Sequence, residues 1–407
     1  MNILLLNAGS SSLKVTVMEL ADGKVVARGL ADWAGPVTLY QYSNSDESQR
    51  VEEVNWSGHA KTVERFVNDL PMSMRSALVA VGHRVVHGGQ FTSSVRITPE
   101  IRERIMELAD LAPLHNPPSL NTLAAAEAAL PGVLHVAVFD TAFHATLSPE
   151  AYTYALPQSW IREWGIRRYG FHGLSHAYCA QRAAEMLASR PSTLPQRLVI
   201  CHLGHGCSAS AVRDGKCVDT TMGFTPLDGL MMGTRCGSID PSIVLHVQQH
   251  HGLTAAQVEA ALNRESGLLG VSGISGDMRQ VLAAAKNGDE HARLAIGIYT
   301  HRVRQAIGAF AVTMGGIDAV VFTAGVGEHA AEIRASICEG LDCLGLDLDE
   351  QANAECQPDA DIASTNSCGR IFVIATQEDV TMFREVIQIL AGGKPLSNEI
   401  LVRVEAS

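Results

Sequence analysis

A short motif that occurs twice constrains the fold of this chain most strongly. The first copy, Asn7 to Lys14, reads Asn-Ala-Gly-Ser-Ser-Ser-Leu-Lys and lies between an apolar run and a run of alternating apolar residues. This pattern is typical of a strand, a tight polar turn and a second strand. With an offset of 195 residues, Leu198 to Val212 aligns with Ile3 to Val17, and Gly204 falls on Gly9. Such repetition predicts two related domains.

The first turn has the composition of a phosphate-binding loop. Gly9 lets the backbone approach a ligand, three serines offer hydroxyl and amide donors, and Lys14 adds a positive charge. It is not a Walker A loop, because the G-x-x-x-x-G-K-[ST] pattern is absent and a strand follows. A single Gly/Ser turn is more often only a turn. Two such turns facing each other predict a nucleotide held in a cleft between two domains.

The length of the chain agrees with this duplication. At 407 residues it exceeds what one hydrophobic core usually serves. We expect one domain over residues 1–147 together with 377–407, and a second over residues 148–376. Predicted strands alternate with predicted helices throughout, which indicates an α/β fold.

Composition excludes several classes of function. No apolar run approaches the roughly 20 residues of a membrane span, and the N-terminus shows no signal-peptide pattern. A net charge of −12 disfavours nucleic acid and anionic membranes as partners. The nine cysteines form no C-x-x-C pair, which favours reduced thiols over disulfides or zinc. We therefore expect a soluble cytoplasmic protein that attracts an anionic ligand through a local cluster of arginines.

Several charged residues stand where a ligand could reach them. Arg84 and Arg235 each lie among glycines, where a guanidinium could clamp a carboxylate or phosphate. An ion pair with a local Asp explains either arginine equally well. Asp140 and Glu378 each follow a predicted strand, the edge at which open α/β sheets bind ligands, and could hold Mg²⁺. His172 begins a predicted helix in Tyr-Gly-Phe-His-Gly.

A third glycine turn leaves a second interpretation open. Gly325-x-Gly327-x-x-Ala330 follows a predicted strand, and Asp347 lies about 20 residues further on, as the dinucleotide-binding fingerprint requires. This pattern favours a nicotinamide-dependent dehydrogenase. Against it, the turn lies late in the chain, and three phosphate-type turns suit a nucleoside triphosphate better than one Rossmann crossover does. The turn could also serve packing alone.

The whole chain resembles the acetate kinase family, within the superfamily of sugar kinases, actin and Hsp70. The motifs that carry the resemblance lie in order along the sequence: Asn7-Ala-Gly-Ser-Ser-Ser-Leu-Lys14, His83-Arg-Val-Val-His-Gly-Gly89, Ala112-Pro-Leu-His-Asn-Pro117, Val138-Phe-Asp-Thr-Ala-Phe-His144, Arg168-Tyr-Gly-Phe-His-Gly173, Met222-Gly-Phe-Thr-Pro-Leu-Asp-Gly-Leu-Met-Met-Gly-Thr-Arg235 and Glu265-Ser-Gly-Leu-Leu-Gly270. The Gly/Met-rich loop up to Arg235 is highly specific.

The resemblance implies two duplicated ribonuclease-H-like domains, the actin-like ATPase fold, in a homodimer. It implies phosphoryl transfer between Mg-ATP, with Mn²⁺ as a possible substitute, and the carboxylate of acetate. Its catalytic residues would be Asp140, Arg84, Arg235 and His172. The acyl group would contact Arg84, Val86, Leu114 and Pro226. ATP would contact Lys14, His202, Leu203, Gly204, His205, Gly206, Asp277, Met278, Arg279, Gly325, Val326, Gly327, Glu328 and His329. The metal would lie near Asn7 and Glu378.

The chain departs from the usual family pattern at several nucleotide-side positions. His205 replaces the Asn of Gly-Asn-Gly in the second turn, and His329 replaces an Asn after the last Gly-Glu. Ser238 and Gln377 stand where Asp and Asn are common. Two imidazoles near phosphates predict a pH dependence around their ordinary pKa of about 6.5.

Substrate choice depends on Val86. Relatives that prefer propionate tend to carry Ala at this position, so Val86 predicts a small acyl pocket and acetate as the substrate. One methylene is worth only about 1 to 3 kcal/mol, which leaves a propionate or butyrate kinase as an alternative. From other classes, the dehydrogenase and an Hsp70-like nucleotide-binding module without turnover remain.

Overall fold

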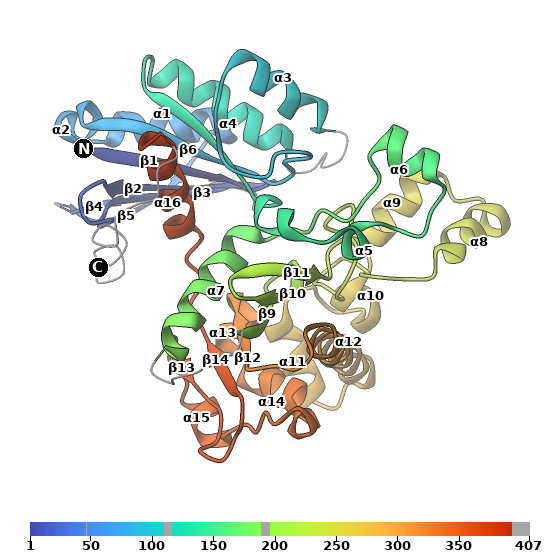
Figure 1. Ribbon diagram of the computed structural model, residues 1–407. Helices are drawn as coiled ribbons and strands as arrows, with labels where there is room; N and C mark the ends of the chain where they lie inside the picture. Colours follow the sequence, from blue (N-terminus) through green and yellow to red (C-terminus); the bar gives the residue numbers. More distant parts are fainter. Residues whose placement is uncertain (46, 110–115, 189–195, 393–407) are drawn as a thin grey trace. The chain divides into compact units, whose positions relative to one another are not determined.

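The computed structural model describes residues 1–45, 47–109, 116–188 and 196–392. The chain divides into two compact units (Figure 1). Unit 1 comprises Met1–Ala142 together with Gln377–Ser407, and unit 2 comprises Phe143–Thr376. The first boundary lies a few residues before the position expected from the sequence, at the start of a short 3-10 helix, η2 (Ala142–Thr146).

Unit 1 is built on a mixed sheet of eight strands in the order β5-β4-β3-β2-β1-β6-β8-β7. The strands are β1 (Asn2–Ala8), β2 (Ser12–Glu19), β3 (Val25–Asp32), β4 (Thr38–Asn44), β5 (Glu47–Val54), β6 (Leu78–Val85), β7 (Val95–Arg96) and β8 (Leu134–Phe139). β1 pairs antiparallel with β2 and parallel with β6, which in turn pairs parallel with β8. The carboxyl ends of β1, β6 and β8 therefore share one edge of the sheet.

Helices cover both faces of this sheet. They are α1 (His59–Asp69), α2 (Met72–Ser76), α3 (Pro99–Glu107), α4 (Asn116–Ala129) and the returning C-terminal helix α16 (Glu378–Leu390). On one face, Leu4 and Val81 share a core with Phe66 of α1 and Ala126 of α4. On the other face, Gly82 of β6 has no side chain, and Val386 of α16 lies against its backbone. α16 thus brings Glu378 to the sheet edge where β1 and β6 end.

Unit 2 is built on a six-stranded sheet in the order β11-β10-β9-β12-β14-β13. The strands are β9 (Arg197–Leu203), β10 (Cys207–Arg213), β11 (Lys216–Thr220), β12 (Ala319–Thr323), β13 (Ala360–Asp361) and β14 (Arg370–Val373). The helices are α5 (Pro149–Tyr152), α6 (Gln158–Trp164), α7 (Gly173–Leu187), α8 (Pro241–His251), α9 (Ala255–Arg264), α10 (Gly267–Ser272), α11 (Met278–Lys286), α12 (Glu290–Met314), α13 (Ala324–His329), α14 (Ala331–Cys338) and α15 (Glu350–Ala354), with a 3-10 helix, η3 (Leu341–Leu344).

One hydrophobic core of unit 2 lies between α7 and the sheet. Cys179, Ala180 and Ala183 of α7 pack on Ile200 of β9 and Val321 of β12, all of them buried. β9 pairs antiparallel with β10 and parallel with β12, and β12 pairs parallel with β14. This is the same pairing that β1 makes with β2 and β6, and that β6 makes with β8.

The two sheets confirm the duplication that the sequence predicts. The strand order β3-β2-β1-β6-β8-β7 corresponds to β11-β10-β9-β12-β14-β13, position by position and with the same directions. The offset read from the repeated turn carries β1 (Asn2–Ala8) onto β9 (Arg197–Leu203). Both units therefore have a strand-turn-strand hairpin at the equivalent place in the sheet.

Three segments complete the description of the fold. Gln41 to Gly58 contains most of the β4–β5 hairpin, and Tyr40 and Tyr42 of β4 are buried. Pro149 to Pro157 contains the short helix α5. Met222 to Ser238 contains neither helix nor strand.

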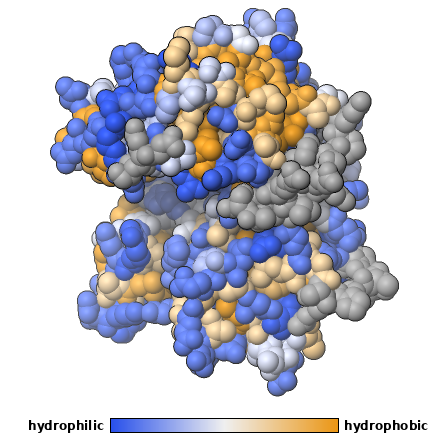
Figure 2. Space-filling model, turned by 90° about the vertical axis from the view of Figure 1, so that its left-hand side faces the viewer, coloured by the Kyte–Doolittle hydropathy of each residue, from blue (hydrophilic) through white to orange (hydrophobic). Residues whose placement is uncertain are grey.

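The surface is mixed in character. On the face drawn in Figure 2, apolar residues gather in a patch in the upper part of the view, and hydrophilic residues surround it. Across the described ranges, no helix is long and apolar enough to cross a membrane, and the 25-residue α12 is no exception. All nine cysteines are free thiols.

Candidate active site

In unit 1, the predicted catalytic residues Arg84 and Asp140 form a close ion pair. Arg84 is the penultimate residue of β6, and Asp140 directly follows β8, so parallel pairing brings them to the same sheet edge. Arg84 Nη2 lies 2.6 Å from Asp140 Oδ2, and Nε lies 3.1 Å from Oδ1. The Asp140 side chain is only 1 % exposed. This bidentate geometry fixes the plane of the guanidinium.

The predicted metal ligands belong to the same cluster. Asn7, near the end of β1, accepts a hydrogen bond from Arg84 Nη1 at 2.9 Å and donates one to Glu378 Oε2 at 3.0 Å. Glu378 Oε2 also lies 3.4 Å from Arg84 Nη1. Burial alone would lower the pKa of Arg84, but the charges of Asp140 and Glu378 raise it above its usual value. The Arg84 charge is thus compensated by two carboxylates.

Lys14 also has a carboxylate partner, which sequence reasoning missed. Its Nζ lies 2.8 Å from Asp379 Oδ2, and Thr16 Oγ1 donates to the same oxygen at 2.9 Å. Asp379 follows Glu378 in the first turn of α16, where negative charge suits the helix dipole. The sequence did contain a signal for this contact, because Asp379 directly follows the predicted metal ligand Glu378 at the start of a predicted helix.

The first turn itself is closed by backbone and histidine contacts. Gly9 N donates to Ser12 O at 2.8 Å, and His59 Nε2 lies 2.8 Å from Gly9 O. A Cβ at Gly9 would lie 2.9 Å from Ser12 Oγ, so a larger residue there would have to displace the Ser12 hydroxyl.

The predicted acyl-group residues belong to different units. Val86 is buried in unit 1, directly after β6, while Pro226 belongs to unit 2. Leu114 lies outside the described residues. Asn116, which sequence reasoning did not single out, is fully buried and ties down the segment after Val86, because its side chain bonds both N and O of His87 at 3.1 Å.

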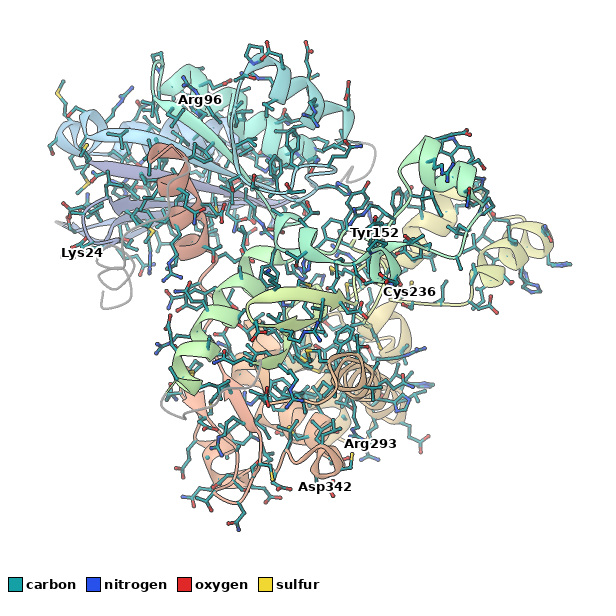
Figure 3. All side chains as sticks on the ribbon, viewed as in Figure 1. Lys24, Arg96, Tyr152, Cys236, Arg293 and Asp342 are labelled. Carbon is teal, nitrogen blue, oxygen red and sulfur yellow. The ribbon has the colours of Figure 1, made fainter. Side chains whose placement is uncertain are left out.

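In unit 2, the loop that carries Arg235 is held against the β9–β10 turn and α10 by backbone contacts. Met232 O accepts from Leu268 N at 2.9 Å, and Gly233 N donates to His205 O at 3.0 Å. Gly267 has a φ of +63°, and a Cβ there would lie 2.2 Å from Met232 O, so only glycine permits this contact. The labelled Cys236, next to Arg235, shows where the loop lies in Figure 3.

Arg235 differs from Arg84 in having no carboxylate at ion-pair distance among the described side chains. Its Nη1 donates to Pro226 O at 3.3 Å and lies 3.9 Å from Met232 Sδ. Burial consequently lowers the pKa of Arg235 below its usual value. Of the two explanations considered for these arginines, the local ion pair applies to Arg84 and not to Arg235.

The predicted catalytic His172 lies close to Arg235. A Cβ built on Gly206 would lie 3.4 Å from His172 Nε2 and 3.6 Å from Arg235 Nη1, so both side chains face this glycine. His172 caps the start of α7 with a φ of +58°, a conformation that costs a non-glycine residue energy. The structure therefore brings His172, Arg235 and the second turn together.

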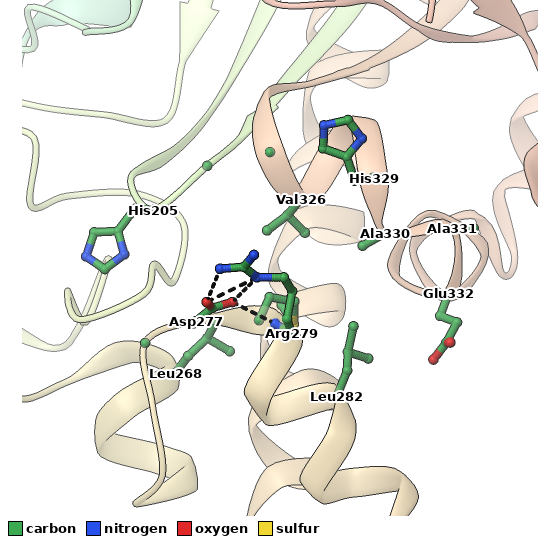
Figure 4. A pocket seen from close by; sticks show the side chains of 14 residues that line it. His205, Leu268, Asp277, Arg279, Leu282, Val326, His329, Ala330, Ala331 and Glu332 are labelled. Carbon is green, nitrogen blue, oxygen red and sulfur yellow. Dashed lines mark hydrogen bonds and ion pairs between the residues drawn. The ribbon is translucent and has the colours of Figure 1, made fainter. Parts of the chain in front are cut away.

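A cavity of about 670 Å³ adjoins the second turn (Figure 4). Figure 4 shows His205 on one side, the Asp277–Arg279 ion pair below, and Val326 and His329 on the other side. Fourteen residues line the cavity: Gly204, His205, Leu268, Gly276, Asp277, Met278, Arg279, Leu282, Gly325, Val326, His329, Ala330, Ala331 and Glu332. It thus unites all three segments that the resemblance assigns to ATP.

Not every predicted nucleotide residue lines this cavity. His202 is buried, with its ring stacked on His172 at 4.1 Å between centroids. Leu203 is buried in β9, and Gly206 and Gly327 are not lining residues. Glu328 Oε1 instead accepts hydrogen bonds from Ala324 N and from Thr376, at 2.8 to 2.9 Å, and so braces the turn after β12.

The turn after β12 is also braced by Arg334, which sequence reasoning missed. Arg334 is 2 % exposed, and its Nη1 donates to Gly327 O at 2.9 Å and Glu328 O at 2.8 Å. The positive φ in this turn belongs to Ala324, at +65°, rather than to either glycine of the fingerprint. α13 ends at His329 after six residues, unlike the longer helix of a dinucleotide-binding crossover.

His205 is set in a positive environment. Partial burial and then the charge of Arg235 lower its pKa below the usual value, while the charge of Asp277 acts in the opposite direction. The pH dependence expected from the sequence, centred near 6.5, should therefore lie at lower pH. Ser238, another departure from the family pattern, donates to Asp228 Oδ1 at 2.5 Å within the same loop.

Asn7 and Glu378 of unit 1 carry oxygen donors, the kind of ligand that a hard divalent cation prefers. Among the described residues, no group of three or more His, Cys, Asp or Glu side chains could hold a metal alone.

Comparison with known proteins gives consistent matches over nearly the whole chain. The model of the acetokinase family matches residues 2–384. The acetate kinase of Gloeobacter violaceus is 46% identical over 96% of this chain and 100% of its own length, and that of Dictyoglomus thermophilum is 42% identical over 96% and 99%. The crystal structure of Porphyromonas gingivalis acetate kinase superposes with a TM-score of 0.87 at 38% identity, covering 96% of this chain and 99% of its own.

A propionate kinase from Francisella tularensis also superposes closely, with a TM-score of 0.88 at 39% identity over 94% of this chain and 98% of its own. These matches confirm the predicted actin-like ATPase fold with two domains. They leave no support for the dehydrogenase interpretation of Gly325 to Ala330.

Proposed function

This chain belongs to the acetate kinase family, and we propose that it transfers the terminal phosphoryl group of ATP reversibly to the carboxylate of acetate, giving acetyl phosphate and ADP. Family membership makes it a kinase that phosphorylates a carboxylate. The observation that carries the assignment is the cavity of unit 2, because the three segments that the resemblance assigns to nucleotide binding line it together.

The proposed transfer is a direct in-line displacement. An oxygen of acetate forms a bond to the terminal phosphorus while the bond to the leaving ADP oxygen breaks. A carboxylate with a pKa near 4 to 5 is already ionised at neutral pH, so no general base is needed. Catalysis then consists mainly of alignment and of positive charge around the transferring oxygens.

The residues of the two units have distinct roles in this proposal. Arg84 orients the acetate carboxylate, held in one plane by the catalytic carboxylate Asp140. Arg235 and His172 stabilise the negative charge that spreads over the phosphoryl oxygens. Arg235 suits this role because no carboxylate among the described residues neutralises it. Lys14 contributes charge near the phosphates.

The family implies ATP and a divalent metal, and we assign the metal as Mg²⁺, with Mn²⁺ able to replace it. Asn7 and Glu378 would hold it, and it would neutralise phosphate charge when bound. We further propose a homodimer located in the cytoplasm, with neither nucleic acid nor membrane as a partner.

A trapping assay tests the proposal. Purified protein is incubated with Mg-ATP and acetate, propionate or butyrate, and the acyl phosphate is captured as its hydroxamate. Turnover highest with acetate supports the proposal. Turnover highest with propionate would instead favour the second candidate, a propionate kinase, to which the close match with the Francisella protein points. Absence of acyl phosphate with every acid would contradict both.

A further inference from the structure

A group of buried histidines lies behind His172 in unit 2. His176, one turn further along α7, is fully buried, and so is Ser208 in β10. His144 and His202 complete the group, with ring centroids 5.7 Å and 6.3 Å from that of His176. Neither His176 nor Ser208 belongs to the predicted site, yet both are connected to it.

Ser208 joins two of these rings. Its Oγ lies 2.9 Å from His172 Nδ1 and 2.8 Å from His176 Nε2. A hydroxyl carries one hydrogen, so it can donate to one ring, and the other ring must donate to the oxygen. If both rings donated, the hydroxyl hydrogen of buried Ser208 would remain unpaired, which is costly.

The direction of these hydrogen bonds follows from His176. Within the described part of the chain, His176 Nδ1 is buried without a hydrogen-bond partner. A buried N–H without an acceptor is rarer in proteins than a bare acceptor, so the ring hydrogen belongs on Nε2 and is donated to Ser208. Burial, followed by the nearby rings of His144 and His202, lowers the pKa of His176 well below its usual value, which keeps the ring neutral.

The hydroxyl of Ser208 then donates to Nδ1 of His172. A neutral imidazole that accepts at Nδ1 carries its hydrogen on Nε2. This nitrogen lies on the side of Gly206, where Arg235 also lies. The chain of hydrogen bonds therefore ends in an N–H on the side of the second turn.

We propose that Ser208 and His176 are positioning residues, which fix the tautomer of His172 so that its Nε2 presents an N–H to the transferring phosphoryl group. This inference rests on the proposed function. The neutral His172 ring can donate its Nε2 hydrogen to a phosphoryl oxygen without gaining a proton. In this arrangement the positive charge comes from Arg235. The groups that face His172 include His176 of α7, His202 of β9, Ser208 of β10 and Arg235 of the loop.

Spectra of the wild-type protein test the tautomers directly. Long-range proton–nitrogen correlation spectra of ¹⁵N-labelled protein distinguish a protonated from a bare ring nitrogen. Both His172 and His176 should carry hydrogen on Nε2 at pH 7.5, and Ser208→Ala should release His172 into a mixture of tautomers. A wild-type His172 with hydrogen on Nδ1 would overturn the proposal, whether or not the protein has kinase activity.

Kinetics separate a positioning role from a structural one. Ser208→Ala and His176→Leu should lower kcat by about 10- to 100-fold, as loss of a supporting hydrogen bond typically does, with little change in the KM for ATP or acetate. His176→Gln should recover most of the loss, because its amide N–H replaces that of Nε2. The matched control is Ser210→Ala, which removes another buried hydroxyl of β10, bonded to Thr220 Oγ1 at 2.9 Å.

The outcomes are distinct. If Ser210→Ala lowers kcat as much as Ser208→Ala, the effect is structural and the inference fails. Equal losses in His176→Gln and His176→Leu would also contradict it. If the wild-type protein makes no acyl phosphate, the proposed function fails. The spectra then still test the inference, because they show which ring nitrogens of His172 and His176 carry hydrogen.

Discussion

The two arginines of the candidate active site differ in how their charge is balanced. Arg84 in unit 1 lies within hydrogen-bond or ion-pair distance of Asp140 and Glu378, which raise its pKa. Arg235 in unit 2 bonds only a carbonyl oxygen and a thioether among the described contacts, and burial lowers its pKa. The two related folds therefore treat their arginines differently. In unit 1, carboxylates neutralise the guanidinium charge of Arg84 and fix its position. In unit 2, the charge of Arg235 is not neutralised by a described carboxylate, so a bound anion would stabilise it.

The largest expected effect comes from removing the uncompensated charge. Arg235→Met should lower kcat by about 10³-fold or more, the range found for arginines that stabilise a transferring phosphoryl group. The measurement is hydroxamate-trapped acyl phosphate at saturating ATP and acetate. Arg293→Met, an exposed arginine on α12, is the control and should keep full activity. A loss below about tenfold would show that Arg235 does not face the developing charge.

The buried histidines of unit 2 predict a loss of stability in acid. Burial lowers the pKa of His144 from 6.5 to about 4, so below about pH 6.5 the unfolded chain binds a proton that the folded chain does not. His144 should thus contribute about 3 kcal/mol that is lost as the pH falls from about 6.5 to about 4. Denaturant unfolding at several pH values measures this, and His144→Gln should have a shallower pH dependence. Equal slopes would contradict the assignment.

Acyl specificity should depend on Val86 of unit 1. Val86→Ala should lower the KM for propionate by an amount equivalent to about 1 to 3 kcal/mol, the value of one methylene in an apolar pocket. The KM for ATP should remain unchanged, because the predicted nucleotide segments that line the cavity all belong to unit 2. An unchanged propionate KM would remove Val86 from the acyl pocket.

The smallest expected effect concerns His205. Its lowered pKa means that it gains a proton only below about pH 6.5, where the added charge should lower the KM for ATP. His205→Asn should lack this acid-side decrease, and in Arg235→Met the decrease should begin at higher pH, since the neighbouring charge is gone. The measurement is the KM for ATP of the three proteins between roughly pH 5 and 8, a range that spans the ordinary histidine pKa. Identical profiles for wild-type protein and His205→Asn would contradict the prediction.

Sequence patterns predict the features that short segments determine. The repeated turn gives the duplication and the approximate positions of β1 and β9, because the pattern of apolar and polar residues within each hairpin is local. Asp140 is found at a sheet edge because the end of a buried strand is visible in the sequence. The resemblance to a family supplies the nucleotide segments that meet around the cavity.

Partners that are distant in sequence could not be predicted in this way. Asp379 pairs with Lys14 only because α16 returns to unit 1, and no local pattern records that contact. Arg334 supports the turn after β12 through carbonyl oxygens, which every residue has. Residue spacing likewise could not show which of the two arginines has a carboxylate partner. Asp140 reaches Arg84 through the pairing of β6 with β8, and Glu378 reaches it because α16 returns to unit 1.

Paired unfolding measurements of Arg84→Met and Arg235→Met test the difference between the two arginines most directly. Arg84→Met leaves buried Asp140 without its partner and should lower the free energy of unfolding by about 3 to 5 kcal/mol. Arg235→Met removes a partly buried charge that has no carboxylate partner in the described chain, and it should leave the stability unchanged or raise it. Equal losses in the two variants would show that both guanidiniums are compensated alike, and would contradict the account.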